Sequence, residues 1–525
     1  MKYKKLEYKN KGRIYDFEYY SLNDIEDKYG LKKKYRVGKF LSLLYKKRIR
    51  NRGIEYGDLL IIRGYVYVSW VELEGVLGSY YWKDLLSDLE DDDIIEVDRD
   101  KSNRFDSNKK LWFIKINDGF IDCKKTIVDI ESGVLNRYLD NQSVKVKNRF
   151  EKKYKKDDLL IWEKVCVMFS TLKIENLDEV IELRFSNKFK ENIEKLNWNW
   201  LSKNERNKIE NNFKDVDNWK SKYKNDLRNY YEVLNEDLHN LKENNWLDFS
   251  DGRFKRDGYG KRLYHLYSNT IREFRDYIKI DDEETIELDI KSCFLSLFFV
   301  LIKDLNSDVE NKFIKDIKSK LLKESNLDWS EISGLDFIDK FSSIFNNEGV
   351  FWSEKNEIEF NDYYDLMRLS YGENHYNDMS RNSYKELVFR LLFSKEYELQ
   401  NLKIENETID DIELRFFGNN GKKLMFWLRR IYLYNWISND EGGRNKIHKR
   451  SNNISLILHY LENSVMDILR YELKKNRFKY ISVFDSLIVK KSDSKNILKI
   501  GNSVLKGIDE SLLLRRKYKD GWKGI

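Results

Sequence analysis

Proline and alanine are both absent from this 525-residue chain, and glutamine and threonine are scarce. The codons of these residues are rich in cytosine, whereas Lys, Asn, Ile and Tyr, which abound, have codons rich in A and T. We infer an AT-rich, C-poor coding strand, which is typical of a phage, a mobile element or a bacterium with a degenerate genome. Because nucleotide bias restricts residue choice, the missing prolines and alanines say little about local structure.

Cysteine and histidine are also scarce, with three and five residues respectively. Cys123, Cys166 and Cys293 lie far apart in apolar surroundings, which argues against a disulfide framework and a zinc site and favours core thiols in a reducing compartment. The histidines form no cluster with metal-ligand spacing. The N-terminus has no apolar leader, and the longest largely apolar run, 294–302, is too short to cross a bilayer. We therefore expect a cytoplasmic protein with no membrane partner.

Charge of one sign is not in large excess, because 97 Lys and Arg residues face 90 Asp and Glu residues, for a formal net charge of +7. This charge permits a nucleic-acid partner without requiring one. The hydrophobic content of 41% is enough for packed cores, although 36% of the residues are charged. A chain of this length holds about two to four domains, and we expect an α+β protein with very polar surfaces.

Two short segments each place a single aspartate at the end of an expected strand. In 285–290, three apolar residues alternate with Asp289, which puts its carboxylate on the opposite face of the strand. In 480–489, two apolar runs flank Asp485 and predict a tight hairpin with this residue at the turn. Two carboxylates at neighbouring strand ends are what a two-metal phosphoryl-transfer site requires. Taken alone, each is also compatible with an ordinary turn or strand-end aspartate.

A third segment, 381–394, carries two cations and two aromatic residues at steps of four. Arg381, Lys385, Phe389 and Phe393 therefore fall along one face of an expected helix. Such a face can bind a triphosphate through its cations and then stack on a base or sugar through its rings.

The order of these segments resembles motifs A, B and C of family A DNA polymerases and phage-type single-subunit RNA polymerases. Asp289 corresponds to the strand aspartate of motif A, and Asp485 to the aspartate of the motif C hairpin. Arg381 and Lys385 match the start of motif B, Arg-x3-Lys-x7-Tyr-Gly. The departures from the family pattern are Phe393 for Tyr, Ser394 for Gly and Phe484 for the His of motif C. The resemblance rests on order and spacing and covers about the last half of the chain.

This resemblance implies a right-hand polymerase fold, with palm, fingers and thumb, and template-directed nucleotidyl transfer. Asp289 and Asp485 would hold two Mg²⁺ ions, with the backbone carbonyl of Ile290 as a further ligand. Arg381 and Lys385 would bind the incoming triphosphate. The rings that would stack against the nascent base pair are those of Phe389 and Phe393. The implied partners are a DNA primer-template and dNTPs.

Phe294 bears on the choice of sugar. It lies five residues after Asp289, where DNA-synthesising members of the family place a bulky side chain that collides with a 2′-hydroxyl. The Phe-Asp-Ser of the expected hairpin is instead closer to the His-Asp-Ser of the RNA polymerases. Because sterics at the sugar act directly on selection, DNA synthesis is favoured. An RNA polymerase or primase, and a non-catalytic DNA-binding replication or regulatory protein, are the alternatives.

Basic residues surround the expected motifs. The segment 258–265 resembles the Gly-Arg-Leu element with which family members contact primer and template; Arg262, followed by Arg272 and Arg275, would bring cations to a phosphate backbone. The alternative is a basic surface loop. An expected helix at 452–475 places His459 where it could face the template, although burial is the alternative. The apolar stripe of this helix is expected at Ile457, Leu461, Val465, Ile468 and Leu469.

The first part of the chain predicts small DNA-binding modules. A capping box at Ser21 and a stop at Gly30 bound an expected helix, and a strongly basic helix follows at 35–50. Further on, the pattern predicts the layout of a winged helix with its wing. The expected elements are a helix at 80–90, a strand at 94–97, a basic loop at 101–109 and a returning strand at 111–114. A small α+β support domain is the alternative.

Three regions are therefore predicted. Residues 1–120 form a winged-helix-like DNA-binding region, and 250–525 form the palm and fingers of the polymerase core. Between them, 121–249 is rich in charged residues with Trp and Leu at helical intervals. The resemblance implies a thumb there, because the thumb precedes the palm in the family, whereas composition alone indicates charged helices or a helical linker.

Overall fold

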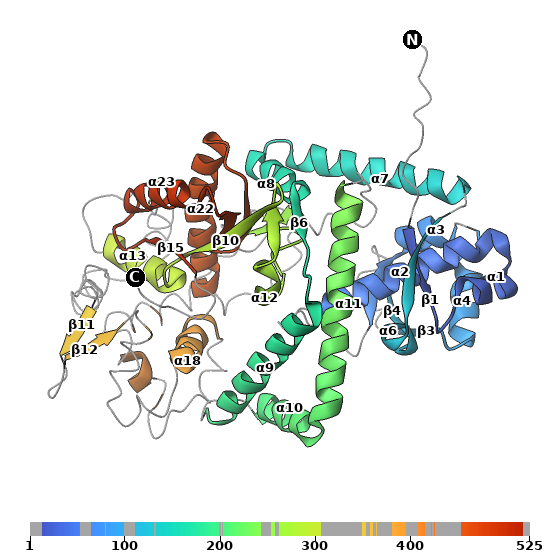
Figure 1. The fold of residues 1–525 in the computed structure, drawn as a ribbon, viewed down its shortest axis with the longest axis horizontal. Helices are drawn as coiled ribbons and strands as arrows, with labels where there is room; N and C mark the ends of the chain where they lie inside the picture. The colour runs from blue at the N-terminus through green and yellow to red at the C-terminus, as the bar shows by residue number, and fades with distance from the viewer. Residues whose placement is uncertain are drawn as a thin grey trace, which may run out of the picture. The chain divides into compact units, whose positions relative to one another are not determined.

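The computed structural model is mixed α+β (Figure 1). It describes residues 13–52, 65–98, 111–130, 133–242, 254–257, 262–305, 349–360, 381–394 and 453–517, apart from short gaps at 79, 199–200, 202 and 353–356, and a few single positions and a short turn between 315 and 425. The expected basic loop at 101–109 and the glycines of the 258–265 segment lie outside the described residues.

The chain divides into two compact units. The first comprises Met1–Lys156, Glu175–Phe185 and Asp215–Arg253, and the second comprises Asp157–Ile174, Ser186–Lys214 and Phe254–Ile525. The chain passes repeatedly between the units, so each unit combines segments that the division into 1–120, 121–249 and 250–525 keeps apart.

The first unit contains two small antiparallel sheets among helices. Its elements are β1 (Arg13–Phe17), α1 (Leu22–Tyr29), α2 (Leu31–Arg52), β2 (Val66–Ser69), α3 (Trp70–Leu77), α4 (Trp82–Asp91), β3 (Ile95–Asp98), β4 (Leu111–Ile116), α6 (Gly119–Asp122), β5 (Lys125–Asp129), α7 (Gly133–Tyr154) and α11 (Val216–Lys242). The helix α9 (Leu177–Leu196) begins in this unit and ends in the second. β1 pairs with β5, and β4 lies between β2 and β3.

The second sheet of this unit has the expected elements in the expected order. Helix α4 and strands β3 and β4 lie where the sequence predicts them, and β4 pairs antiparallel with both β2 and β3. The predicted capping box is also present, because the amide of Asp24 donates to Ser21 Oγ (3.2 Å) and the amide of Ser21 donates to Asp24 Oδ2 (2.7 Å). Gly30 ends α1 at a φ of 79°, which glycine adopts without strain.

Several basic residues of α2 are turned inward, although Lys32 near its start is exposed. Lys46 and Arg48 are buried, and Arg48 pairs with Asp118. Arg50 forms a two-pronged ion pair with Asp237 of α11 (2.5 and 3.0 Å). The helix that looks most basic in the sequence is therefore a core helix whose cations are neutralised by carboxylates from the same unit.

The second unit is built on a six-stranded sheet in the order β13-β14-β10-β9-β6, with β15 pairing with β10. Its strands are β6 (Ser170–Leu172), β9 (Ile278–Ile280), β10 (Glu283–Ile290), β13 (Tyr480–Val483), β14 (Ser486–Lys490) and β15 (Leu514–Arg516). Two further strand pairs are β7 (Lys255–Arg256) with β8 (Leu263–Tyr264), and β11 (Gly349–Trp352) with β12 (Glu357–Phe360). The predicted strand at 285–290 and the hairpin at 480–489 thus lie side by side.

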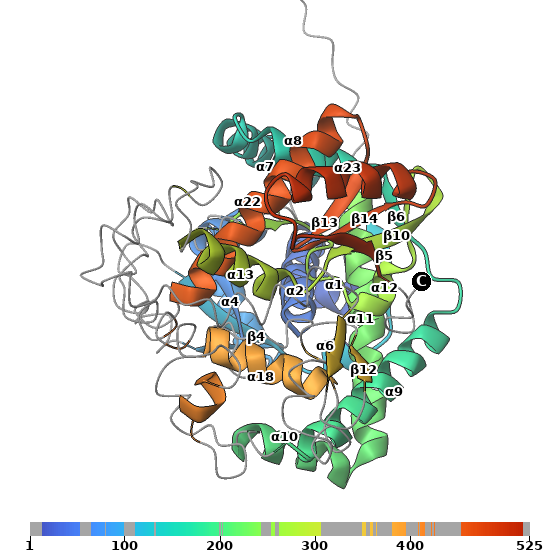
Figure 2. The same cartoon turned by 90° about the vertical axis from the view of Figure 1, so that its left-hand side faces the viewer.

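The helices of this unit are α8 (Asp158–Met168), α10 (Lys203–Lys214), α12 (Arg272–Arg275), α13 (Cys293–Leu305), α18 (Arg381–Phe393), α22 (Asn453–Lys475) and α23 (Ser494–Lys506). Of these, α8 contacts β13 and α23 contacts β15 of the sheet (Figure 2). The central helix is α22, which contacts α8, α13, α18 and α23. Its predicted stripe is confirmed at Ile457, Leu461, Val465 and Leu469. Ile468 is an exception with 38% of its surface exposed, because it lies one residue off the four-residue step that points into the core.

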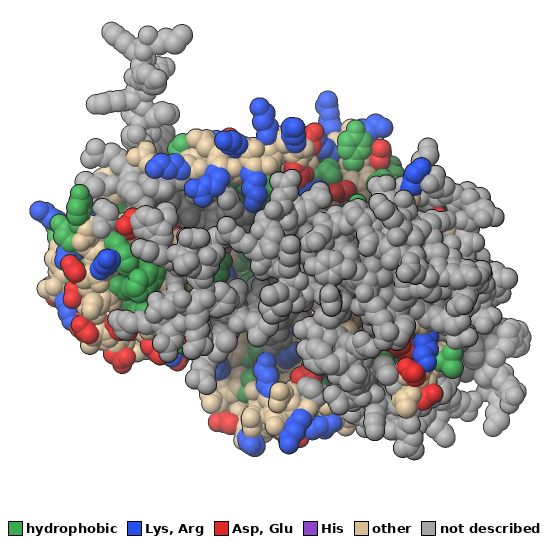
Figure 3. All heavy atoms as spheres, turned by 180° about the vertical axis from the view of Figure 1, so that it is seen from behind, with side chains coloured by type: hydrophobic (Ala, Val, Ile, Leu, Met, Phe, Trp, Pro, Cys, Tyr) green, Lys and Arg blue, Asp and Glu red, His purple; other side chains and the backbone are tan. Residues whose placement is uncertain are grey.

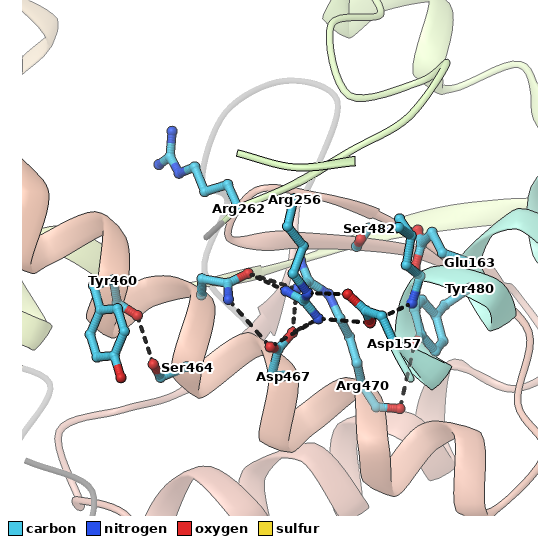
Figure 4. Close-up of polar contacts among 12 residues, drawn as sticks. Asp157, Glu163, Arg256, Arg262, Tyr460, Ser464, Asp467, Arg470, Tyr480 and Ser482 are labelled. Atoms are coloured by element: carbon cyan, nitrogen blue, oxygen red, sulfur yellow. Dashed lines mark hydrogen bonds and ion pairs between the residues drawn. The ribbon is translucent and has the colours of Figure 1, made fainter. Parts of the chain in front are cut away.

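A network of ion pairs ties α8, β7 and α22 together (Figure 4). Arg256 contacts Asp157 (2.5 Å) and Asp467 (3.1 Å), and Arg470 contacts Asp467 (2.9 Å) and Asn463 (3.2 Å). Arg470 is 1% exposed. We refer to Asp157, Arg256, Asn463, Asp467 and Arg470 as the ion network. Every charge in it faces a charge of opposite sign, which is the condition for burying charged groups at low cost.

Candidate active site

The two predicted catalytic aspartates are brought together by strand pairing. In the antiparallel register of β10 and β14, Asp289 lies opposite Ser486, whose Oγ donates a hydrogen bond to Asp289 Oδ1 (2.8 Å). The backbone amide of Ile290 donates to the carbonyl of Asp485 (3.1 Å). The sheet therefore fixes Asp289 on β10 next to the turn that carries Asp485 and leads into β14, as a rigid scaffold for a site requires.

The turn that carries Asp485 is a tight one. Val483 pairs with Ser486, so only Phe484 and Asp485 connect β13 and β14. Phe484 has a φ of 56°, which costs a residue with a side chain on the order of 1 kcal/mol. Its ring packs edge-on against Tyr264 (5.8 Å between centroids) and faces the guanidinium of Arg262 (4.7 Å). These contacts hold the turn in its left-handed conformation.

The two carboxylates disfavour each other's ionisation. Burial raises the pKa of Asp289 to about 7, and the neighbouring Asp485 carboxylate adds to the increase. Burial also raises the pKa of Asp485 to about 6, with a further contribution from Glu462. Lys517 opposes both shifts. Both residues keep some surface in contact with solvent, so a cation can reach the pair and relieve the repulsion.

A third carboxylate on the same face of β10 is already neutralised. Glu287 lies two residues before Asp289, and its Oε1 is 2.9 Å from Lys517 Nζ and 3.4 Å from Arg275 Nη1. Burial raises the pKa of Glu287, but Lys517 and Arg275 outweigh it and lower that pKa overall. Arg275 also donates to the carbonyl of Thr270 (2.9 Å). The sequence predicts that Arg275 contacts a nucleic-acid phosphate backbone, whereas in the structure it binds Glu287 of β10 and the carbonyl of Thr270.

Arg262, which the sequence also predicts to contact a nucleic-acid phosphate backbone, is largely buried within the candidate site. Its side chain is 15% exposed and forms an ion pair with Glu462 of α22, which is 1% exposed. The guanidinium lies between two rings, 4.7 Å from the centroid of Phe484 and 5.6 Å from that of Phe294. Arg262 therefore links the turn that carries Asp485 to the predicted sugar-selecting residue. Arg272, by contrast, is exposed on α12.

The predicted nucleotide-binding rings form one cluster. Phe294 of α13 contacts Phe393 (5.0 Å between centroids) and Phe389 (6.0 Å), both on α18. His459 of α22 lies 5.3 Å from Phe294 and stacks on Phe393 at 5.8 Å. We refer to Phe294, Phe389, Phe393 and His459 as the aromatic cluster. Burial, together with the charge of Arg262, holds the pKa of His459 well below its usual range, so the ring is neutral.

The cationic end of α18 is described in part. Lys385 Nζ lies 5.5 Å from the ring centroid of Phe389, one helical turn away, which agrees with the shared face predicted for these residues. Arg381 begins the helix, but its side chain lies outside the described residues. Ile290 is 1% exposed, and its side chain belongs to the hydrophobic core, so the predicted role of its backbone carbonyl as a ligand stays a prediction.

Sequence reasoning missed two contributors to this site. Glu287 could have been found, because it alternates with Asp289 on the polar face of the strand. Lys517 directly follows β15 and lies 230 residues after its partner Glu287, and no local pattern in the sequence indicates this pairing.

A search of protein-family models and of curated proteins found no match to this chain. Within the described residues, no group of three or more His, Cys, Asp or Glu side chains is arranged to hold a metal ion. None of the helices in that part of the chain combines the length and apolar character needed to span a membrane.

Proposed function

We propose that this protein catalyses template-directed nucleotidyl transfer, extending the 3′-hydroxyl of a DNA primer with dNTPs, and that the second unit acts as the palm and fingers of a right-hand polymerase. The observation that carries the proposal is the pair Asp289 and Asp485. The pairing of β10 with β14 places Asp289 beside the turn that carries Asp485, and each of the two residues has a raised pKa. No arginine is recorded within ion-pair distance of either among the described residues.

The donor set suits Mg²⁺. Carboxylate and carbonyl oxygens are the protein ligands that this ion prefers, and it commonly uses one or two carboxylates together with substrate phosphates. Asp289 and Asp485 would hold the ions, with the carbonyl of Ile290 as a further ligand. Bound Mg²⁺ would supply activation of the attacking hydroxyl and stabilisation of the leaving oxygens. When substrate phosphates complete the coordination of the ions, no third protein carboxylate is needed. This agrees with a site that has the two carboxylates of Asp289 and Asp485.

The remaining side chains bind and orient the nucleotide. Lys385 lies on the face of α18 that also bears Phe389, and the four-residue step predicts the same face for Arg381. Both cations would offset charge on the triphosphate. Phe389 and Phe393 provide apolar faces for the nascent base pair. Phe294 would exclude a 2′-hydroxyl, and its packing against Arg262 and His459 limits its freedom to move aside.

Primer extension tests the proposal. A labelled primer on a heteropolymeric DNA template is incubated with Mg²⁺ and either dNTPs or NTPs. We expect extension with dNTPs that falls at least about 10³-fold in Asp485→Asn and Asp289→Asn, because the carboxylate charge, and not its shape, holds the ions. The matched control is Asp282→Asn, an exposed aspartate at the turn before β10, where asparagine also tolerates the φ of 62°.

The other outcomes identify the alternatives. Extension with NTPs, on primed or unprimed templates, would make the protein an RNA polymerase or primase and would contradict the role of Phe294. A role for Phe294 also predicts that Phe294→Val admits NTPs at the expense of selectivity. If neither substrate is used and DNA binding survives Asp289→Asn with Asp485→Asn, the protein is a non-catalytic DNA-binding protein.

A further inference from the structure

Helix α7 of the first unit ends in the densest basic segment of that unit's described surface. Between residues 141 and 156 the sequence has seven Lys or Arg residues and one acidic residue, Glu151. Six of the seven cations are exposed, namely Lys145, Arg149, Lys152, Lys153, Lys155 and Lys156. Figure 3 shows Lys and Arg side chains along the top of the view, where α7 runs. The seventh, Lys147, lies 3.9 Å from Glu151.

Three of these cations form a straight stripe. With 100° of rotation per residue, Lys145, Arg149 and Lys152 fall within about 60° of one another around the helix, and they span about 10 Å along it. One strand of duplex DNA carries a charge about every 3.4 Å along the axis, so the stripe spans about three phosphates. No ion pair is recorded for these three side chains among the described residues. Their charges are therefore available to a partner.

The opposite face of α7 is anchored. Leu135, Leu139, Phe150 and Tyr154 are buried, so the helix presents its basic face in a fixed orientation. This also argues against a lipid surface as the partner. A membrane-surface helix inserts a continuous apolar face, whereas among the side chains of α7 that the structure describes, Val144 is the one large apolar residue that is exposed.

The winged-helix-like elements offer no comparable surface. A winged helix would present α4 to the major groove, yet the exposed residues of α4 include Asp84, Asp88 and Asp91 with Lys83 as a single cation. These carboxylates would repel phosphates. In the C-terminal half of α2, Lys47, Arg48 and Arg50 form ion pairs within the unit. Among the described elements of the first unit, α7 is thus the one that fits a polyanion.

We propose that the first unit binds the phosphate backbone of nucleic acid through the stripe Lys145, Arg149 and Lys152, without reading sequence and without using α4. Flanking Lys153, Lys155 and Lys156 strengthen the local positive potential. This proposal and the proposed function both involve nucleic acid as the partner, and they have nothing else in common. It does not depend on Asp289 or Asp485, so either proposal can fail while the other stands.

The test is binding of a fluorescein-labelled 20-bp DNA duplex to the full-length chain, measured by anisotropy from 50 to 300 mM NaCl. The variant is Lys145→Gln with Arg149→Gln and Lys152→Gln, since glutamine keeps helix propensity. We expect the slope of log K against log salt to fall by about 3 and the affinity at 0.1 M salt to fall on the order of 100-fold, equally for unrelated duplex sequences.

A matched control separates this surface from net charge. Lys32→Gln with Lys83→Gln and Lys124→Gln removes the same charge from exposed, scattered positions of the first unit. We expect this control to change the salt slope by less than 1. Equal losses in the two triple variants, or an unchanged slope in the α7 variant, would overturn the proposal. So would loss of binding to phosphatidylserine vesicles by the α7 variant with DNA binding intact, which would assign the stripe to a membrane.

Discussion

The second unit holds two pairs of carboxylates that its fold treats in opposite ways. Asp157 and Asp467 belong to the ion network, where Arg256 contacts both of them at ion-pair distance and Arg470 contacts Asp467. Asp289 and Asp485 instead neighbour each other. Burial, together with the charge of Asp485, raises the pKa of Asp289 to about 7. A structural carboxylate in the ion network comes with its counter-charge, whereas the raised pKa of two neighbouring carboxylates without an ion pair among the described residues is the pattern on which the proposed cation site rests.

Removing one of the two cations from the ion network should have the largest effect on stability. Arg470→Met keeps most of the side-chain volume but removes the buried cation, so that Asp467 and Asn463 keep Arg256 as their one remaining cationic partner in the network. We expect the free energy of unfolding to fall by about 3–5 kcal/mol, measured by urea denaturation. The control Lys475→Met breaks an exposed pair with Glu472 (3.7 Å) on the same helix and should cost less than about 0.5 kcal/mol. Equal losses in the two variants would show that burial of the network does not matter.

Two buried titratable residues near the ion network, His265 and Glu163, extend the comparison to the pH dependence of stability. Burial lowers the pKa of His265 to about 3 and raises that of Glu163 to about 7, and the two side chains lie 3.3 Å apart. In the unfolded chain His265 has an ordinary pKa of about 6.5 and binds a proton below that pH, whereas in the folded protein it stays neutral. His265 therefore lowers the free energy of unfolding as the pH falls below 6.5. Glu163 has the opposite effect, because the folded form holds a proton that the unfolded form loses above about pH 4.5.

In the native chain these two effects largely cancel between pH 5 and 6.5. Each single variant should expose one of them, with a slope of at most about 1.4 kcal/mol per pH unit. Glu163→Gln should lose stability on acidification from pH 6.5 to 5, and His265→Gln should gain it. Denaturation midpoints of both variants, measured between pH 5 and 6.5, test these two opposite slopes. Slopes of the same sign in both variants would contradict the assigned directions.

The smallest expected effect is a gain in stability at the candidate active site. Because the folded-state pKa of Asp289 is raised, its ionised form costs stability as pH rises from about 4 through 7. Asp289→Asn removes this cost and can still accept the hydrogen bond from Ser486. In EDTA we expect a gain of about 1 kcal/mol at pH 8, after allowing for solvent screening, and a smaller gain at pH 5. A loss at pH 8 would show that the carboxylate stabilises the fold.

Local patterns in the sequence predicted the scaffold of the site well. The alternation in 285–290 predicted β10, the two apolar runs around Asp485 predicted the hairpin, and the four-residue step predicted the shared face of Lys385 and Phe389. These features depend on periodicity, which a single segment contains in full. The side chain of Arg381 lies outside the described residues, so its part in that face stays a prediction.

The fate of the basic residues was not predictable in the same way. Arg262 is paired with Glu462, which lies 200 positions away, and Arg50 is paired with Asp237, which lies 187 positions away. A stretch rich in Lys and Arg looks the same in sequence whether its partners are phosphates or carboxylates from a distant helix. Only the tertiary fold separates α2, whose charges are used internally, from α7, whose charges are exposed.

The measurement that tests the central claim most directly is stabilisation by Mg²⁺. Thermal unfolding is followed at pH 8 in EDTA and in a Mg²⁺ series for the native chain and for Asp289→Asn with Asp485→Asn. The account predicts that Mg²⁺ raises the melting temperature of the native chain, by an amount worth about 2.7 kcal/mol at one hundred times Kd, and that it leaves the double variant unchanged. An equal response in both proteins, or no response in the native chain with dNTP and primer-template present, would contradict the assignment of these two carboxylates to bound cations.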